Sequence, residues 1–133
     1  MSEPELKMDM ASSDAVRRCV ESYCANERHP NLPRFKIHGP LKYEDIWKLN
    51  AVNLPGCYVI YGENGAFRYV GMSLTNIGNR ISSHFSDATQ KSPFWAQGPK
   101  ARFVDLIEVI KPWEAPSLEQ YLIVHSSKFN ACN

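Results

Sequence analysis

Two tyrosines, an arginine and a histidine lie close together in the sequence between residues 54 and 85. Tyr58 and Tyr69 each sit in a short apolar run, and Arg80 and His84 follow four residues apart. In a helix this spacing places the arginine and the histidine on one face. A pair of phenols, a cation and an imidazole on one small unit is an unusual polar cluster. It indicates chemistry on a phosphate group.

The elements that must position this cluster follow one another in the order β-β-α-β-α. Asn64 and Gly65 join the two apolar runs, and both residue types tolerate the positive φ angles of a tight hairpin turn. Pro112 and Pro116 end the third strand and open the last helix. The pattern therefore predicts an α/β (α+β) fold, with a small three-stranded mixed or antiparallel sheet flanked by helices. The expected elements are strands at 56–61, 67–72 and 102–110, helices at 76–88 and 117–128, and a polar loop at 89–100.

An N-terminal extension, residues 1–53, precedes this unit of residues 54–133. Ser12 or Ser13 can cap a helix whose apolar side chains recur at helical spacing, which indicates that it packs on the body of the protein. Several prolines and a glycine then favour extended chain. The expected order is a disordered start of about ten residues, one amphipathic helix to about Glu27, an extended connector at 28–41 and a short helix at 43–49.

The composition fits one ordinary globular domain without a bulk attraction for polyanions. The chain has 133 residues, of which 44% are hydrophobic and 22% charged, and its formal net charge is +1. Any contact with a nucleic acid must therefore come from a local patch, and the modest cluster of basic residues between 28 and 48 offers one. The sequence shows no signal peptide and no membrane-length apolar run, so we expect a cytoplasmic protein without membrane contact.

The four cysteines indicate free thiols in a reducing compartment. They show no C-x-x-C spacing and no matched histidine pair, which argues against a zinc site. Cys19 and Cys24 fall within the expected first helix, and Cys57 falls in an apolar strand. We therefore expect them to be thiols of the hydrophobic core.

Taken together, these motifs resemble the signature of the GIY-YIG nuclease family. The triplet GCY at 56–58 is followed, after ten residues, by YVG at 69–71. The resemblance covers about residues 54–133, which is essentially the whole catalytic module of that family. The match continues with Arg80 and His84 in the next helix, Glu119 after the third strand, and Asn130 in the sequence KFN, with Asn133 as an alternative.

The resemblance implies metal-dependent hydrolysis of phosphodiester bonds in DNA. Glu119 is the expected metal ligand, since a lone carboxylate suits Mg²⁺ (or Mn²⁺) that keeps most of its waters. Arg80 would hold the scissile phosphate through its planar fork of donors. Gly71 would permit close approach of the substrate to the backbone, and Asn130 is carried over as a further site residue.

By the same resemblance, Tyr58 activates or positions the attacking water, and Tyr69 hydrogen-bonds the phosphate or the water. A phenol with a pKa of about 10 is a poor base at neutral pH unless a nearby cation lowers that pKa. The metal or Arg80 could provide that cation. His84, one helical turn beyond Arg80, could assist Tyr58 or relay its proton.

The polar loop at 89–100 is expected to bind substrate. Lys91, Trp95 and Lys100, together with Phe94, combine cations and aromatic rings as nucleic-acid surfaces do. An equal alternative is that Phe94 and Trp95 anchor the loop to the core.

Met72 departs from the family pattern, because many members carry a lysine or a small polar residue after this motif. A thioether donates no hydrogen bond and carries no charge. The second hypothesis is therefore a catalytically impaired module of the same fold that binds nucleic acid or a protein partner. The sequence also leaves open DNA versus RNA. Since one active site cuts one strand, a homodimer or a partner protein stays open as the source of a second cut.

Overall fold

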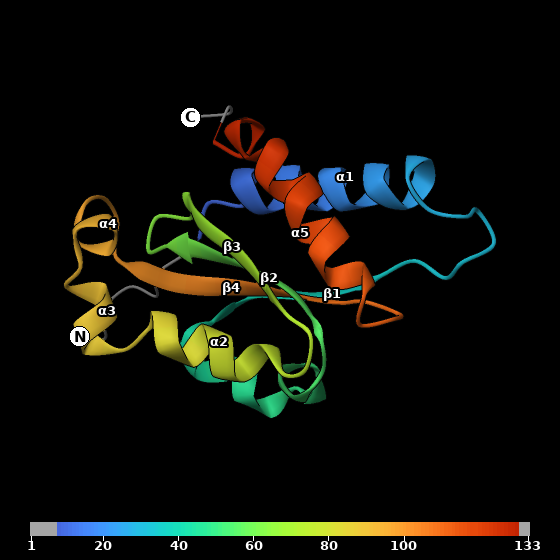
Figure 1. Ribbon diagram of the computed structural model, residues 1–133. Coiled ribbons are helices and arrows are strands. Elements are labelled where there is room, and N and C mark those ends of the chain that lie inside the picture. The colour runs from blue at the N-terminus through green and yellow to red at the C-terminus, as the bar shows by residue number, and fades with distance from the viewer. Residues whose placement is uncertain (1–7, 131–133) are drawn as a thin grey trace, which may run out of the picture.

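A four-stranded antiparallel sheet lies between two layers of helices in the computed structural model, which describes residues 8–130 (Figure 1). The fold class agrees with the sequence. Helices α1 and α5 cover one face of the sheet, and α2 with two short 3₁₀ segments covers the other. In chain order the elements are α1 (Ala11–Asn26), β1 (Lys36–Lys42), η1 (Tyr43–Lys48), η2 (Asn50–Asn53), β2 (Gly56–Gly62), β3 (Phe67–Ser73), α2 (Ile77–His84), α3 (Asp87–Gln90), α4 (Pro93–Ala96), β4 (Ala101–Glu108), α5 (Glu114–Val124) and η3 (Ser126–Lys128).

The sheet has one strand more than the sequence indicated. Its order is β1-β4-β2-β3, and the additional strand, β1, lies in the segment that was expected to be an extended connector. Gly39 and Pro40 hid this strand, because proline cannot donate to a sheet ladder. The structure accommodates both residues because β1 is an edge strand and its register with β4 shifts between His38 and Leu41.

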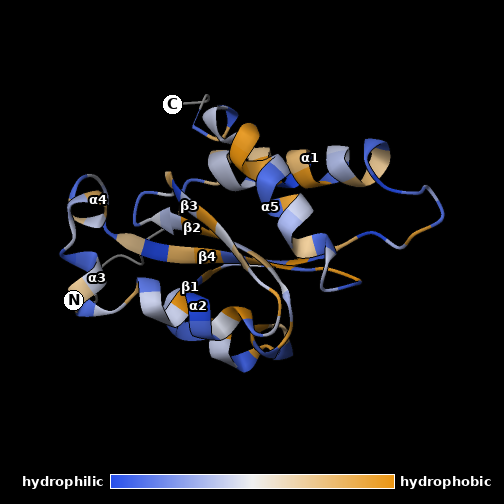
Figure 2. Ribbon diagram, viewed as in Figure 1, coloured by the Kyte–Doolittle hydropathy of each residue, from blue (hydrophilic) through white to orange (hydrophobic). Residues whose placement is uncertain are grey.

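Alternate residues of the central strand β2 face the two helical layers. Cys57, Val59 and Tyr61 belong to the core beneath α1 and α5, whereas Tyr58 and Ile60 belong to the core above α2, η1 and η2. Every residue of β2 is buried. Figure 2 shows hydrophobic residues gathered along these central strands, while the segment that follows α1 is mostly hydrophilic.

A bulge in β3 sets which side chains join each layer. Ile60 pairs with Tyr69, but the next residue of β2, Tyr61, pairs with Phe67, so Arg68 is the extra residue. Without this bulge Phe67 would share a face with Tyr69, because side chains alternate along a strand. Instead Phe67 packs against the core beneath α1 and α5, and Tyr69 packs on the side of α2.

The two serines expected to cap α1 bind elsewhere. The residue before the helix is Met10, which makes no side-chain cap, and Ser12 and Ser13 are both buried within the helix. Ser13 donates a hydrogen bond of 2.8 Å to the fully buried Asp105 of β4. The cap prediction was therefore wrong, because a buried carboxylate needs donors more than a solvated helix end does.

Asp105 of β4 accepts hydrogen bonds from three donors, of which Ser13 and Arg17 belong to α1 and so join this helix to the sheet. Tyr61 donates at 2.7 Å and Arg17 at 3.2 Å, in addition to Ser13. Burial raises the pKa of this carboxyl, while the hydrogen bonds from Tyr61 and Ser13 and the charge of Arg17 oppose that rise. The extension thus joins the body of the protein by a buried polar network as well as by apolar packing.

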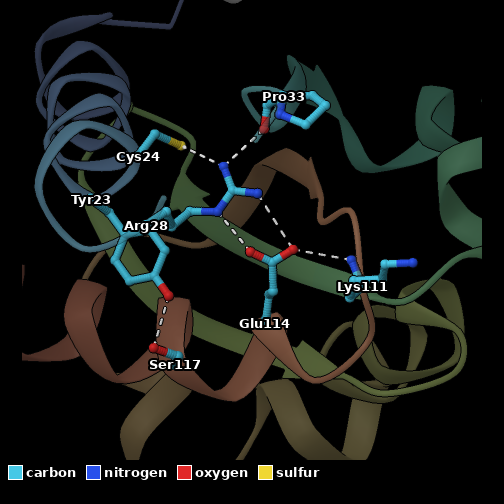
Figure 3. Close-up of polar contacts among 7 residues, drawn as sticks. All are labelled: Tyr23, Cys24, Arg28, Pro33, Lys111, Glu114 and Ser117. Atoms are coloured by element: carbon cyan, nitrogen blue, oxygen red, sulfur yellow. Dashed lines mark hydrogen bonds and ion pairs between the residues drawn. The ribbon is translucent and has the colours of Figure 1, made fainter. Parts of the chain in front are cut away.

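Arg28 fixes the start of α5 (Figure 3). Its side chain is only 4% exposed and forms an ion pair with Glu114, the first residue of α5, at 2.6 Å. The same guanidinium donates to the carbonyl of Pro33 at 2.8 Å and lies 4.1 Å from the ring centre of Phe35. Arg34, another member of the basic cluster between 28 and 48, pairs with Glu21. Arg28 is therefore an internal anchor, and the cluster offers less free charge than its sequence indicated.

The remaining elements differ from expectation mainly at their ends. Helix α2 ends at His84, and the polar segment after it contains the one-turn helices α3 and α4. Helix α5 begins at Glu114, because Pro116 is tolerated in the first turn of a helix. Cys19, Cys24 and Cys57 are free thiols, as expected, and Cys132 lies outside the described residues. Disorder was expected over about the first ten residues. Residues 1–7 also lie outside the described residues, whereas Met8 packs against the core beneath α1 and α5. Between residues 8 and 130, no helix is long and apolar enough to cross a membrane.

Candidate active site

The candidate site lies where the side chain of Tyr58 passes over Gly71. The two residues are direct partners on β2 and the edge strand β3. A Cβ atom at position 71 would lie 2.4 Å from Tyr58 Oη and 2.9 Å from a ring carbon of Tyr69. Only glycine therefore leaves room for the phenol to extend across the edge strand. The sequence predicted a close approach of the substrate at Gly71, but in the structure the side chain of Tyr58 occupies the space over this glycine.

His84 meets the phenol of Tyr58 at the end of α2. Tyr58 Oη and His84 Nε2 lie 2.9 Å apart, within hydrogen-bonding distance. Asn76 caps the start of α2 by accepting from the backbone N–H of Asn79, and Gly78 lets the helix pack closely on Val52. These local contacts set the position of the last residue of α2, and hence of the imidazole.

The electrostatics of His84 favour its neutral form. Burial lowers the pKa of the imidazole below its ordinary value of 6.5, and the charge of Arg80, one turn earlier, lowers it further. A neutral imidazole with its proton on Nδ1 can accept the phenolic proton of Tyr58 at Nε2. Neutral His84 can therefore accept a hydrogen bond from Tyr58.

Arg80 and Glu119 bring opposite charges to Tyr58. Burial is the main cause that raises the pKa of the phenol well above 10, and Tyr69 and Glu119 raise it further. The charge and a hydrogen bond of Arg80 act in the opposite direction. Tyr58 is therefore a neutral phenol at physiological pH, and we do not expect a free phenolate.

Glu119 reaches this cluster from the opposite helical layer. Its neighbours Ala115, Leu118 and Leu122 are buried in the core beneath α1 and α5, and this packing fixes the rotation of the helix. Burial raises the pKa of Glu119 above its ordinary value of 4.5, while the charge of Arg80 lowers it. Arg80 on α2 and Glu119 on α5 thus act on each other and on the same phenol.

The ring of Tyr69 packs against the other rings of the cluster. Its centre lies 4.4 Å from the ring centre of His84, 6.3 Å from that of Tyr58 and 5.8 Å from that of Trp95. The structure therefore brings together five of the residues selected from the sequence: Tyr58, Tyr69, Arg80, His84 and Glu119.

Asn130 lies elsewhere and has a different partner. Its side-chain oxygen accepts hydrogen bonds from the backbone N–H of Phe67 at 3.0 Å and from the hydroxyl of Ser12 at 3.3 Å. Phe67 begins β3 and faces the α1 and α5 layer. Within residues 8–130, Asn130 makes no hydrogen bond to the five clustered side chains, and Asn133 lies outside that range.

The three residues expected to bind substrate from the polar loop fall into two groups. Trp95 is only 6% exposed and packs against Tyr69 and His84, so it anchors the loop to the core. Lys91 and Lys100 are exposed on the same segment. Sequence reasoning missed Arg68, which binds this loop, because only the pairing register shows that it is a bulge residue.

Met72 lies on the face of the sheet that α1 and α5 cover. It is partly buried against the core beneath α1 and α5, on the opposite face of β3 from Tyr69. The thioether therefore faces the helical layer that carries Glu119 and not the layer that carries Arg80 and His84.

Glu119 is the carboxylate that this cluster offers to a metal ion. In the described part of the chain, no three histidine, cysteine, aspartate or glutamate side chains gather into a ready-made metal site. A lone carboxylate does fit a hydrated Mg²⁺ ion, which takes one or two carboxylates together with substrate phosphate oxygens and keeps several waters.

Comparison with known proteins gives one match. The family model of the GIY-YIG catalytic domain matches residues 54–133. Neither the curated proteins nor the solved structures contain a match to the chain.

Replacing Gly71 by alanine tests how the site is built. The added methyl group must displace the ring of Tyr58, so Gly71→Ala should break the contact between Tyr58 and His84. We expect the imidazole ¹⁵N shifts of His84 in Gly71→Ala to match those of Tyr58→Phe, which removes the hydroxyl directly. Wild-type shifts in Gly71→Ala would contradict this geometry.

Proposed function

This chain belongs to the GIY-YIG family of catalytic domains, and from that premise we propose that it is a metal-dependent endonuclease that hydrolyses phosphodiester bonds in DNA. The observation that carries the proposal is the 2.9 Å contact between Tyr58 and His84, at which Arg80 and Glu119 also act. A phenol and an imidazole joined in this way form a path for a proton. A cation and a carboxylate beside them suit a phosphate and a metal ion.

The proton path runs from water to His84. A water molecule held by Tyr58 Oη attacks phosphorus, and its oxygen forms the new P–O bond as the bond to the leaving oxygen breaks. Tyr58 takes the proton of the water and gives its own proton to Nε2 of His84. The neutral imidazole is the final acceptor, so the raised pKa of Tyr58 is no obstacle. The leaving oxygen takes a proton from solvent.

Arg80 holds the phosphate in this scheme. Its side chain is exposed on α2, beside Tyr58, and its charge is permanent. The guanidinium donates to the nonbridging oxygens, where negative charge grows in the transition state. Tyr69, on the neighbouring strand, donates its hydroxyl to the same phosphate.

Glu119 would hold the divalent cation, Mg²⁺ or Mn²⁺. When bound, the ion supplies positive charge to the phosphate and to the leaving oxygen. The charge of Arg80 acts on the partly buried Glu119, which supports a shared site for the carboxylate and the phosphate-binding guanidinium.

The alternative of a catalytically impaired binding module was supported by Met72 and by the near-neutral charge of the chain. The side chain of Met72 packs on the face of the sheet that α1 and α5 cover, whereas Tyr69 packs on the other face. The 2.9 Å contact of His84 with Tyr58 supports a scheme in which the imidazole accepts the proton, and this scheme requires no lysine after the YVG triplet.

Glu119→Ala should abolish cleavage of supercoiled plasmid in Mg²⁺ or Mn²⁺. The loss of the metal-binding carboxylate should slow nicking by about 100-fold or more, and EDTA should stop the wild type. Glu63→Ala, which changes an exposed glutamate in the β2–β3 turn, is the matched control and should cleave at the wild-type rate. Wild-type nicking by Glu119→Ala would contradict the proposal.

The pH dependence of single-turnover cleavage should show an acid limb and no alkaline limb up to about pH 9. Cleavage needs neutral His84 and ionised Glu119. The pKa of His84 is lowered from 6.5, and that of Glu119 is raised from 4.5, so the rate falls as pH decreases below 6.5. The pKa of Tyr58 is raised above 10, so the phenol keeps its proton in alkaline solution. A rate that peaks below pH 6 would contradict these roles.

A further inference from the structure

We propose that Phe94 is a stacking site for one unpaired nucleobase beside the scissile phosphate, so that the preferred substrate is DNA with a single-stranded flap or branch. This inference rests on the proposed function and names its substrate class. It follows from the exposure of the Phe94 ring, from the contacts of Arg68 that hold the loop carrying this ring, and from the position of the ring beside the candidate active site.

Phe94 presents an open aromatic ring next to the catalytic cluster. The residue is 55% exposed, although burial of phenylalanine is strongly favoured. Its ring centre lies 6.4 Å from that of Tyr69, at an interplanar angle of 74°. It also meets the ring of Trp95 edge to face, at 5.0 Å. A base that stacked on Phe94 would therefore lie beside the rings of Tyr69 and Trp95.

Anchoring the loop does not explain the exposed ring. Trp95, the neighbouring residue, is 6% exposed and packs against Tyr69 and His84. That contact fixes the loop to the core by itself. Phe94 is thus free for a ligand, whereas Trp95, which the sequence proposed for substrate binding, is not.

Arg68 holds the loop in this conformation. Its guanidinium donates to the backbone carbonyls of Phe94 at 3.0 Å, Trp95 at 3.1 Å and Gln97 at 2.5 Å. It also lies 5.3 Å from the ring centres of both Phe94 and Trp95. Gly98 gives it room, since a Cβ atom there would lie 2.5 Å from the guanidinium. Three hydrogen bonds and two cation–π contacts make the position of Phe94 fixed before any ligand binds, which lowers the entropic cost of binding.

Arg68 lies in the bulge of β3, the strand that also carries Tyr69. Arg68 is the extra residue of the bulge, and Tyr69 follows it directly. The loop that carries Phe94 is therefore attached at the residue next to the catalytic tyrosine. Arg68 is a positioning residue for Phe94, and it does not itself touch the phosphate.

The exposed ring fits an unpaired base and not a continuous duplex. In a duplex both faces of each base are covered by its neighbours, so a side chain can stack only on a base that has left the helix or was never in it. Stacking on an aromatic ring tolerates every base, so this site would select DNA structure and not sequence. Lys91 and Lys100, exposed on the same segment, supply charge for the adjoining backbone.

A binding experiment with defined DNA structures tests this site. The protein carries Glu119→Gln to prevent cleavage, and fluorescein-labelled probes are a duplex with a single-stranded flap and a continuous duplex of equal length. Phe94→Ala should weaken binding to the flap about tenfold, as the loss of one base–aromatic stack requires, and should leave binding to the duplex unchanged. Phe94→Trp should bind the flap as tightly as wild type. The matched control is Trp113→Ala, which removes a ring that is 71% exposed before α5, and it should have no effect.

Removing the base from the DNA tests the same contact from the side of the ligand, and together with Phe94→Ala it forms a double-mutant cycle. An abasic residue is placed in turn at each of the three flap positions nearest the junction. At one of these positions the abasic residue should weaken flap binding by the parent protein about tenfold. At the same position it should not weaken flap binding by the Phe94→Ala variant below the value for the intact flap. Arg68→Ala should reproduce the effect of Phe94→Ala, whereas Arg34→Ala, at an exposed ion pair, should not.

Several outcomes would overturn the inference. Equal flap binding by Phe94→Ala and the parent protein would do so, as would abasic losses of the same size in both proteins. Metal-dependent cleavage of continuous duplex with no effect of Phe94 would overturn the stacking site and leave the proposed nuclease function intact. Absence of both cleavage and binding for every probe would overturn both proposals.

Discussion

The candidate active site depends on one steric condition, the absence of a side chain at position 71. Tyr58 starts from a buried central strand, and its hydroxyl can reach the edge of the sheet only across Gly71. There the phenol meets His84 from α2, and Arg80 and Glu119 act on it from the two helical layers. An edge strand is the natural place for this meeting, since it is where groups from both faces of a sheet can approach one another.

Contacts in the outer layers help to fix the positions of the side chains that surround Tyr58. Arg28 joins the end of α1, the following segment and the first residue of α5, five residues before Glu119. Asp105 fastens α1 to β4 from within the core. The N-terminal extension therefore contributes a strand and a helix to the same body, and it helps to set the rotation of α5. Catalytic groups misplaced by about 1 Å can lose two orders of magnitude in rate, so such remote anchors matter for chemistry.

Sequence reasoning captured the features that depend on local pattern and type of residue. The hairpin at Asn64 and Gly65, the amphipathic first helix and the clustering of five polar side chains could all be predicted. Only Gly65, however, takes the positive φ expected of both turn residues. The fourth strand could not, because Gly39 and Pro40 interrupt its pattern and only pairing with β4 makes it a strand. The caps at Ser12 and Ser13 failed because a distant carboxylate, Asp105, binds Ser13. The exposure of Phe94 and the burial of Trp95 could not be predicted either, because both depend on the bulge in β3 and on the contacts of Arg68.

The coupling between Tyr58 and His84 in single-turnover cleavage tests the central claim most directly. The measurement compares the rates of wild type, Tyr58→Phe, His84→Ala and the double variant. If the two side chains form one proton path, the double variant should be no slower than the slower single variant, because each single change already breaks the path. Rate losses that multiply in the double variant would show that the two residues act independently and would contradict the account.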